Sequence, residues 1–190
     1  MLIRFNKNFF LYLFFLLFSA CAYRHGAPER SIPGGVSEVS VPMFKNLSQE
    51  VGIETSFTNA LVDELSQSRV AKLNPHSEVE VQGTIESVQY FPSASSYPKG
   101  AINGSPFPLV LATDYRIVIV IGMMVKNRGD DKILWTDKFT GERTFSASQV
   151  KSPIVSGVNP IYNLSAKRRN INELAQDLVA EATDKMTESF

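Results

Sequence analysis

The sequence predicts an α+β fold, a mixed four-stranded sheet with two helices in the order β-α-β-β-β-α. Apolar and polar residues alternate in three segments, which is the period of a strand with one buried face, and a fourth segment is apolar on both faces. In two other segments the apolar residues recur three and four positions apart, as on one face of a helix. A helix between the first two strands implies a right-handed parallel crossover, whereas a later tight turn implies an antiparallel pair.

The composition is that of one ordinary domain. Of the 190 residues, 44% are hydrophobic, which supplies enough apolar material for a core. The 19 Lys and Arg residues balance 19 Asp and Glu residues, so neither a polybasic nor an acidic tail is present. A single cysteine excludes an internal disulfide, and with only two histidines it excludes a cysteine and histidine zinc site.

Residues 1–20 have the three regions of a secretory signal peptide. Arg4 and Lys7 give a basic start, an apolar run follows from Phe9 to Phe18, and small residues end the segment. The run has about ten residues, short of the roughly 20 that a spanning helix needs. Without this segment the chain has 17 basic and 19 acidic side chains, a net charge of −2, which argues against nonspecific nucleic-acid binding.

Cys21 follows in Phe18-Ser19-Ala20-Cys21, which resembles a bacterial lipobox except at Phe18, where Leu is commoner. We expect Cys21 to be lipidated, the alternative being an unmodified cysteine. Several acyl chains would anchor the protein firmly, at about 0.8 kcal/mol per buried methylene. Ala22 in place of Asp favours the outer membrane. Residues 21–35 lack apolar periodicity and are expected to form a lipidated tether before a single domain at 36–190.

The domain is expected to begin with a strand in which Val39, Val41 and Met43 alternate with polar residues. Pro42 cannot donate to a ladder and belongs at a strand end or an edge. Residues 49–70 then have helical spacing, with Ile53, Phe57, Ala60, Leu61 and Leu65 on one face.

A second strand is expected from Val79 to Tyr90, with a bulge near Glu86 and Ser87 because the alternation changes phase there, as in a bent strand at a sheet edge. Residues 92–112 are rich in proline and serine and are expected to form a long loop. Residues 115–125 are apolar on both faces and predict a central strand.

A turn at 127–131 and renewed alternation through Ile133, Trp135 and Phe139 predict a hairpin. A second long loop is expected at 146–163. The C-terminal helix is expected to begin at Asn170, with Glu173 completing the cap.

Two surfaces are candidates for contacts. Two helices can cover only one face of a small sheet, so Val118, Val120 and Met124 form a candidate partner surface, unless the two long loops fold over it. Cations are unfavourable at a helix start. The run Lys167-Arg168-Arg169 is therefore either simply solvated or in contact with an anionic lipid head group.

Catalytic chemistry is not indicated. His25 lies in the tether and His76 in a connection, so neither is placed to orient a triad. The turn after the first strand lacks the glycines that cradle a phosphate. We therefore expect no enzymatic activity, no metal site and no cofactor.

Several segments together resemble the LPS-assembly lipoprotein family, LptE-like. They occur in family order and cover nearly all of the chain after the tether: Val39-Ser40-Val41-Pro42-Met43-Phe44-Lys45-Asn46, Gly52-Ile53-Glu54, Thr58-Asn59-Ala60-Leu61, Val81-Gln82-Gly83-Thr84-Ile85, Tyr115-Arg116-Ile117 and Ile133-Leu134-Trp135. The family often has Cys-Gly-Tyr-His where this chain has Cys21-Ala22-Tyr23-Arg24-His25, and the 92–112 loop also departs from it.

The resemblance implies a non-enzymatic lipoprotein on the periplasmic side of the outer membrane. It would plug the LPS-assembly barrel protein, assist the assembly of that barrel and deliver lipopolysaccharide to the outer leaflet. In the family, basic loop residues contact lipopolysaccharide phosphates, and Lys99 and Lys151 have the corresponding location and charge.

Two other classes share part of the pattern. The stretch Val41-Pro42-Met43-Phe44-Lys45-Asn46-Leu47-Ser48 also resembles the first strand of curli-secretion and penicillin-binding-protein-activator lipoproteins. The former predicts a large homo-oligomer and the latter a complex with a peptidoglycan synthase. A periplasmic hydrolase would need an acid and base pair that the sequence does not provide.

Overall fold

The computed structural model describes residues 30–96, 111–146, 149–151, 156–158 and 160–188. The chain divides into two units, Met1–Arg30 and Ser31–Phe190. The elements below all belong to the second unit.

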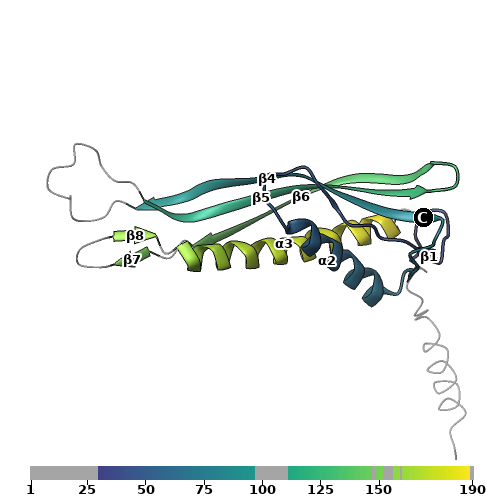
Figure 1. The fold of residues 1–190 in the computed structure, drawn as a ribbon, viewed down its shortest axis with the longest axis horizontal. Coiled ribbons are helices and arrows are strands. Elements are labelled where there is room, and N and C mark those ends of the chain that lie inside the picture. Colours follow the sequence, from purple (N-terminus) through teal and green to yellow (C-terminus); the bar gives the residue numbers. More distant parts are fainter. Residues whose placement is uncertain (1–29, 97–110, 147–148, 152–155, 159, 189–190) are drawn as a thin grey trace, which may run out of the picture. The chain divides into compact units, whose positions relative to one another are not determined.

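The second unit contains eight strands and two helices among its described residues (Figure 1). In chain order they are β1 (Glu38–Val39), β2 (Lys45–Asn46), α2 (Ile53–Ser68), β3 (Lys72–Leu73), β4 (Val79–Ser96), β5 (Leu111–Asn127), β6 (Ile133–Ser146), β7 (Gln149–Lys151), β8 (Ser156–Val158) and α3 (Pro160–Glu188).

The main sheet has four strands in the order β2-β4-β5-β6. β2 runs parallel to β4, and the other neighbours are antiparallel. Two small sheets accompany it, a parallel pair of β1 with β3 and an antiparallel pair of β7 with β8. The predicted α+β class, the mixed four-stranded sheet and the parallel crossover around α2 are therefore confirmed.

Both helices lie on the same side of the main sheet (Figure 1). The core forms between them and the inner face of the sheet, where alternate residues of β5 are almost fully buried: Ile117, Ile119, Ile121, Met123 and Val125. The predicted face of α2 supplies Phe57, Leu61 and Leu65, and α3 supplies Ile171, Leu174, Leu178 and Val179. Burying such a side chain contributes about 1.5–3 kcal/mol.

The bulge in β4 is confirmed, because the pairing with β5 shifts between Ile85 and Ser87. The expectation that this strand lies at an edge is wrong, since β4 pairs with β2 on one side and β5 on the other. β2 has only two residues, too few for the sequence pattern to reveal it as the edge strand.

The predicted loop at 92–112 is too long at both ends. β4 continues to Ser96 and β5 begins at Leu111, with Pro92 opposite Tyr115. Pro92 is tolerated because the register shifts between Pro92 and Ala94, where a missing ladder donor costs little.

The second predicted loop, 146–163, is also partly regular structure. It includes β7, β8 and the start of α3 at Pro160. Proline suits the first turn of a helix because its fixed φ is already helical. The predicted cap at Asn170 is therefore wrong: Asn170 lies inside α3, is buried, and donates its amide to the Ala166 carbonyl at 2.7 Å.

The first predicted strand is shorter than expected. The chain leaves the sheet after the bridge at Ser40 and rejoins it at Lys45, so Val41, Pro42 and Met43 are outside the ladder. Met43 is 67% exposed, and Phe44 enters the core in its place. Gly83 makes this possible, because a Cβ at that position would lie 2.1 Å from the Phe44 ring.

We therefore expect Gly83→Ala to displace Phe44 and lower the free energy of unfolding by about 1–3 kcal/mol. Thermal denaturation followed by circular dichroism would measure the loss. Thr84→Ala, at the next position of the same strand, is the matched control and should change stability much less. Equal melting temperatures for wild type and Gly83→Ala would contradict the close packing of Phe44.

Candidate functional site

The face of β4, β5 and β6 opposite the helices, here called the outer face, carries the predicted partner surface. Val118, Val120 and Met124 alternate with the buried row of β5 and are only partly buried. Their neighbours across the ladders are polar: Gln89 and Glu142 beside Val118, Ser87 and Thr140 beside Val120, and Gln82 and Thr136 beside Met124. The outer face is thus a narrow apolar stripe between polar strands.

Two ion pairs lie on the outer face, one across the stripe between Val120 and Met124 and one at its end, beyond Val118. The Lys138 ammonium lies 2.8 Å from a Glu86 carboxylate oxygen, and this pair spans β5 above Gly122. Arg116 pairs with Glu142 at 3.5 Å and lies 5.5 Å from the centre of the Phe91 ring. These exposed pairs contribute little stability, but they tie the three strands together across the stripe.

At one end of the sheet, the basic segment of α3 reaches β4 through a three-residue contact. Lys167 lies 2.7 Å from the Glu50 carboxylate, and Tyr90 donates its hydroxyl to the same oxygen at 2.8 Å. The Lys167 ammonium is also 4.5 Å from the centre of the Tyr90 ring. Burial, followed by the Glu50 carboxylate, raises the pKa of Tyr90. We call these residues the Lys167 clamp.

Arg168 and Arg169 differ from Lys167. Both are exposed, and neither forms an ion pair with any residue in the described ranges. The two alternatives for the basic run, solvation or contact with an anionic lipid head group, therefore apply to Arg168 and Arg169 and not to Lys167. Lys167 has a structural partner, whereas the two arginines remain available for an anionic group.

The sequence did not reveal what holds Glu50 in place. The Asn46 side chain organises the turn before α2. Its Oδ1 accepts from the Ser48 backbone amide at 2.9 Å and from the Ser48 hydroxyl at 2.7 Å, and its Nδ2 donates to the Glu50 backbone carbonyl at 2.7 Å. The amide also donates to Glu54 at 3.0 Å. Backbone hydrogen bonding and then Asn46 lower the pKa of Glu54. The spacing Asn46-x-Ser48 is an Asx-turn signal that could have predicted this turn.

Other predicted site residues fall outside the described structure. Cys21 and Lys99 lie outside the described residues, and Lys151 ends β7 but its side chain is not described. Their positions relative to Arg168 and Arg169 are therefore outside what the structure describes. His76 is described: it is exposed in a turn, and its backbone amide donates to Asn74 at 3.0 Å.

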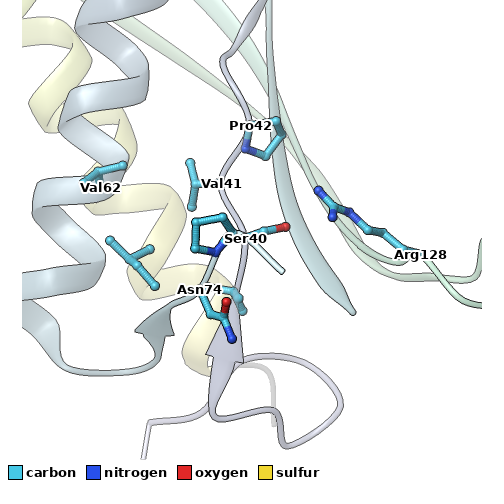
Figure 2. Close-up of a pocket in the computed structure, with 9 residues that line it drawn as sticks. Ser40, Val41, Pro42, Val62, Asn74 and Arg128 are labelled. Atoms are coloured by element: carbon cyan, nitrogen blue, oxygen red, sulfur yellow. The ribbon is translucent and has the colours of Figure 1, made fainter. Parts of the chain in front are cut away.

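A pocket of about 370 Å³ lies at the other end of the unit (Figure 2). Its wall is mostly apolar, with Val41, Pro42 and Val62 around Ser40 and Asn74. Arg128 also lines it, but its guanidinium is paired with Glu80 at 3.0 Å, and this contact lowers the pKa of Glu80. The lining contains no set of groups suited to acid and base catalysis.

The described residues contain no cluster of three or more His, Cys, Asp or Glu side chains that could hold a metal ion. Within the same ranges, none of the helices is both long and apolar enough to cross a membrane.

The main sheet is covered by helices on one side only (Figure 1), and α3 carries an exposed basic segment. Residues 36–189 match the model of the LptE family, described as lipopolysaccharide-assembly. The match spans most of the chain, so this protein belongs to the LptE family and is a lipopolysaccharide-assembly lipoprotein. A comparison with curated proteins found no match.

Solved structures with a similar chain trace include other bacterial lipoproteins. The rare lipoprotein B from Shewanella oneidensis has 13% identity and a TM-score of 0.38, covering 80% of this chain and 92% of that one. A minor lipoprotein from Acinetobacter baumannii has 10% identity and a TM-score of 0.45, covering 80% and 93%. A PelC dodecamer from Paraburkholderia phytofirmans has 14% identity and a TM-score of 0.43, covering 77% and 85%. Family membership rests on the sequence match alone.

We expect Lys167→Met to lower the free energy of unfolding by about 1 kcal/mol, because it leaves the Glu50 carboxylate without its cation. Urea denaturation of this variant and wild type at the same pH would measure the difference. Arg169→Met, two positions away on the same helix, is the matched control and should be nearly neutral. An equal loss in both variants would show that the Lys167 clamp contributes no specific stability.

Proposed function

We propose that this lipoprotein plugs the outer-membrane LPS-assembly barrel, assists the assembly of that barrel and helps deliver lipopolysaccharide to the outer leaflet. Membership of the lipopolysaccharide-assembly family supports this role. The role is non-enzymatic, because a plug acts through its surfaces and needs no reactive group.

The proposal rests on one observation, that the outer face of the sheet is not covered by either helix. Its three strands form a broad surface that neither helix covers, and its centre holds the apolar stripe of Val118, Val120 and Met124. The wall of a large barrel is itself a sheet lined with polar and small side chains. A flat face with a narrow apolar stripe and polar margins suits such a wall better than it suits a free aqueous surface.

Lipopolysaccharide contact is assigned in this proposal to the end of the sheet near the start of α3. Arg168 and Arg169 are exposed in the first half of α3, and α3 begins at the end of the sheet where β4 ends and β5 begins (Figure 1). Lys99 falls between these two strands in sequence, and Lys151 belongs to β7. Arginine binds phosphate through two parallel hydrogen bonds, and lysine acts as a point charge.

Anchoring is assigned to Cys21. Its lipobox-like context and Ala22 favour lipidation and the outer membrane, and the tether at 21–35 would connect the acyl chains to the domain. The protein would then act on the periplasmic side of that membrane.

The barrel complex is tested by affinity purification of the tagged full-length lipoprotein from detergent-solubilised outer membranes. We expect a one-to-one complex with a large barrel protein, and loss of most of it in Val118→Lys with Val120→Glu, because both substitutions place charge on the stripe. Gln176→Glu, on the exposed side of α3, is the control and should keep the complex. A large homo-oligomer or a peptidoglycan synthase in place of the barrel would reject the plug.

Lipopolysaccharide binding is tested with two charge reversals, Lys99→Glu with Lys151→Glu, and Arg168→Glu with Arg169→Glu. Each should reduce the lipopolysaccharide retained by the immobilised protein at low salt, without lowering the melting temperature by more than a few degrees. Lys72→Glu with Lys132→Glu, exposed lysines at the other end of the unit, is the control and should bind normally. A pair whose reversal leaves retention unchanged is not part of the site.

A further inference from the structure

β6 is a long sheet edge. It has 14 residues, pairs with β5 on one side, and has no strand partner on its other side among the described residues. Proteins usually blunt such an edge with proline, a bulge, charged side chains or a short strand. β6 contains no proline, and the register shift in its ladder leaves Leu134 unpaired near the start of the strand, so the edge from Trp135 onward is uninterrupted. The opposite edge of the main sheet is different, because β2 has only two residues.

The hydrogen bonding of Lys138 shows which main-chain groups face outward. Its amide donates to the Asp137 carboxylate at 2.8 Å. In an antiparallel ladder, residues that bond to the neighbouring strand alternate with residues that point away from it. The groups that point away from β5 therefore belong to Thr136, Lys138, Thr140, Glu142 and Thr144.

We propose that a second copy of this chain pairs with this edge, so that the two β6 strands run antiparallel with Thr140 of each copy on the two-fold axis. The charged side chains of β6 complement one another in this arrangement, and inside one copy Asp137 and Arg143 also pair with side chains of α3. This register places opposite charges or compatible side chains against each other at every step: Lys138 opposite Glu142, Asp137 opposite Arg143, Thr136 opposite Thr144, Trp135 opposite Phe145 and Phe139 opposite Gly141.

The hydrogen-bonding phase agrees with the same register. Every outward-pointing residue of one copy meets an outward-pointing residue of the other, so the two edges can exchange amide and carbonyl bonds once the Lys138 amide leaves the Asp137 carboxylate. Opposite charges and threonine pairs that face each other across strands are favourable, and two-fold symmetry repeats every pair except the central one.

The pairing also brings the two α3 helices together. α3 packs mainly against β6 and less against β5, and Leu178 and Leu174 lie against Gly141. The two α3 helices would therefore face each other across the two-fold axis beneath a continuous eight-stranded sheet, and packed helices need about 8–10 Å between their axes. This pairing does not rest on the proposed function.

Disulfide trapping in the full-length lipoprotein, purified in detergent, tests the register. Thr140→Cys lies opposite itself, at the separation of about 5.5 Å of a hydrogen-bonded pair, which a disulfide can span. It should form a covalent dimer under mild oxidation. Thr136→Cys should not, because its copies would be about 27 Å apart, eight residues at about 3.4 Å each. Thr136→Cys combined with Thr144→Cys should form the covalent dimer again. Wild type is the control for any crosslink made through Cys21, the cysteine already present in the chain.

Charge reversal tests the complementarity. Lys138→Glu and Glu142→Lys should each weaken dimerisation by roughly tenfold in sedimentation equilibrium, because each creates two like-charged pairs across the axis. The double variant should restore it to within about threefold. Inside one copy, Lys138 pairs with Glu86 and Glu142 with Arg116, and the double variant restores neither pair. Recovery can therefore arise only between copies.

Several results would overturn the proposal. These are a monomer for wild type at all concentrations, equal trapping of Thr140→Cys and Thr136→Cys, or a double charge variant no better than the single ones. Trapping of Thr140→Cys on another protein in outer membranes, without a self-linked dimer, would assign the edge to that partner instead.

Discussion

The packing of two helices against one face of the sheet is the constraint on which the rest of the structure depends. The inner row of β5 is almost entirely without solvent contact, and both helices contribute their apolar faces to it. Each such side chain contributes about 1.5–3 kcal/mol, so this layer accounts for most of the driving force. Two helices can cover only one face of the sheet. The outer face is consequently left to polar side chains, with one apolar stripe in the middle.

Charged contacts then fix α3 along the sheet. Near its start, Lys167 binds Glu50 beneath Tyr90. Further along, Arg143 of β6 binds Glu173 and Asp177, and near its end Lys185 pairs with Asp137 at 2.8 Å. The order of these partners shows that α3 runs antiparallel to β6. Each pair alone contributes little because it is partly exposed, but together they set the register of a helix whose apolar contacts are less specific.

The same architecture leaves two surfaces unsatisfied, and they differ in kind. The outer face offers side chains, whereas the free edge of β6 offers main-chain donors and acceptors. A barrel wall and a second copy would use different parts of the molecule. The two contacts could therefore be made at different stages, with self-pairing at the edge protecting it before the barrel is available.

The sequence by itself determined the alternation of β5, the apolar face of α2, the bulge in β4 and the parallel crossover, because local periodicity records which face is buried. It also placed Val118, Val120 and Met124 on the face opposite the buried row. The lengths of β4 and β5, the start of α3 at Pro160 and the pairing of Lys167 with Glu50 emerge only in the three-dimensional structure. The added strand ends pair across the intervening segment, as Ser96 does with Leu111, and Glu50 lies far from Lys167 in the chain, so short-range patterns contain no information about these contacts. Prolines caused the errors in these boundaries. A proline usually indicates the end of a strand or helix, but Pro92 lies at a bulge and Pro160 in the first turn of a helix, where proline is tolerated.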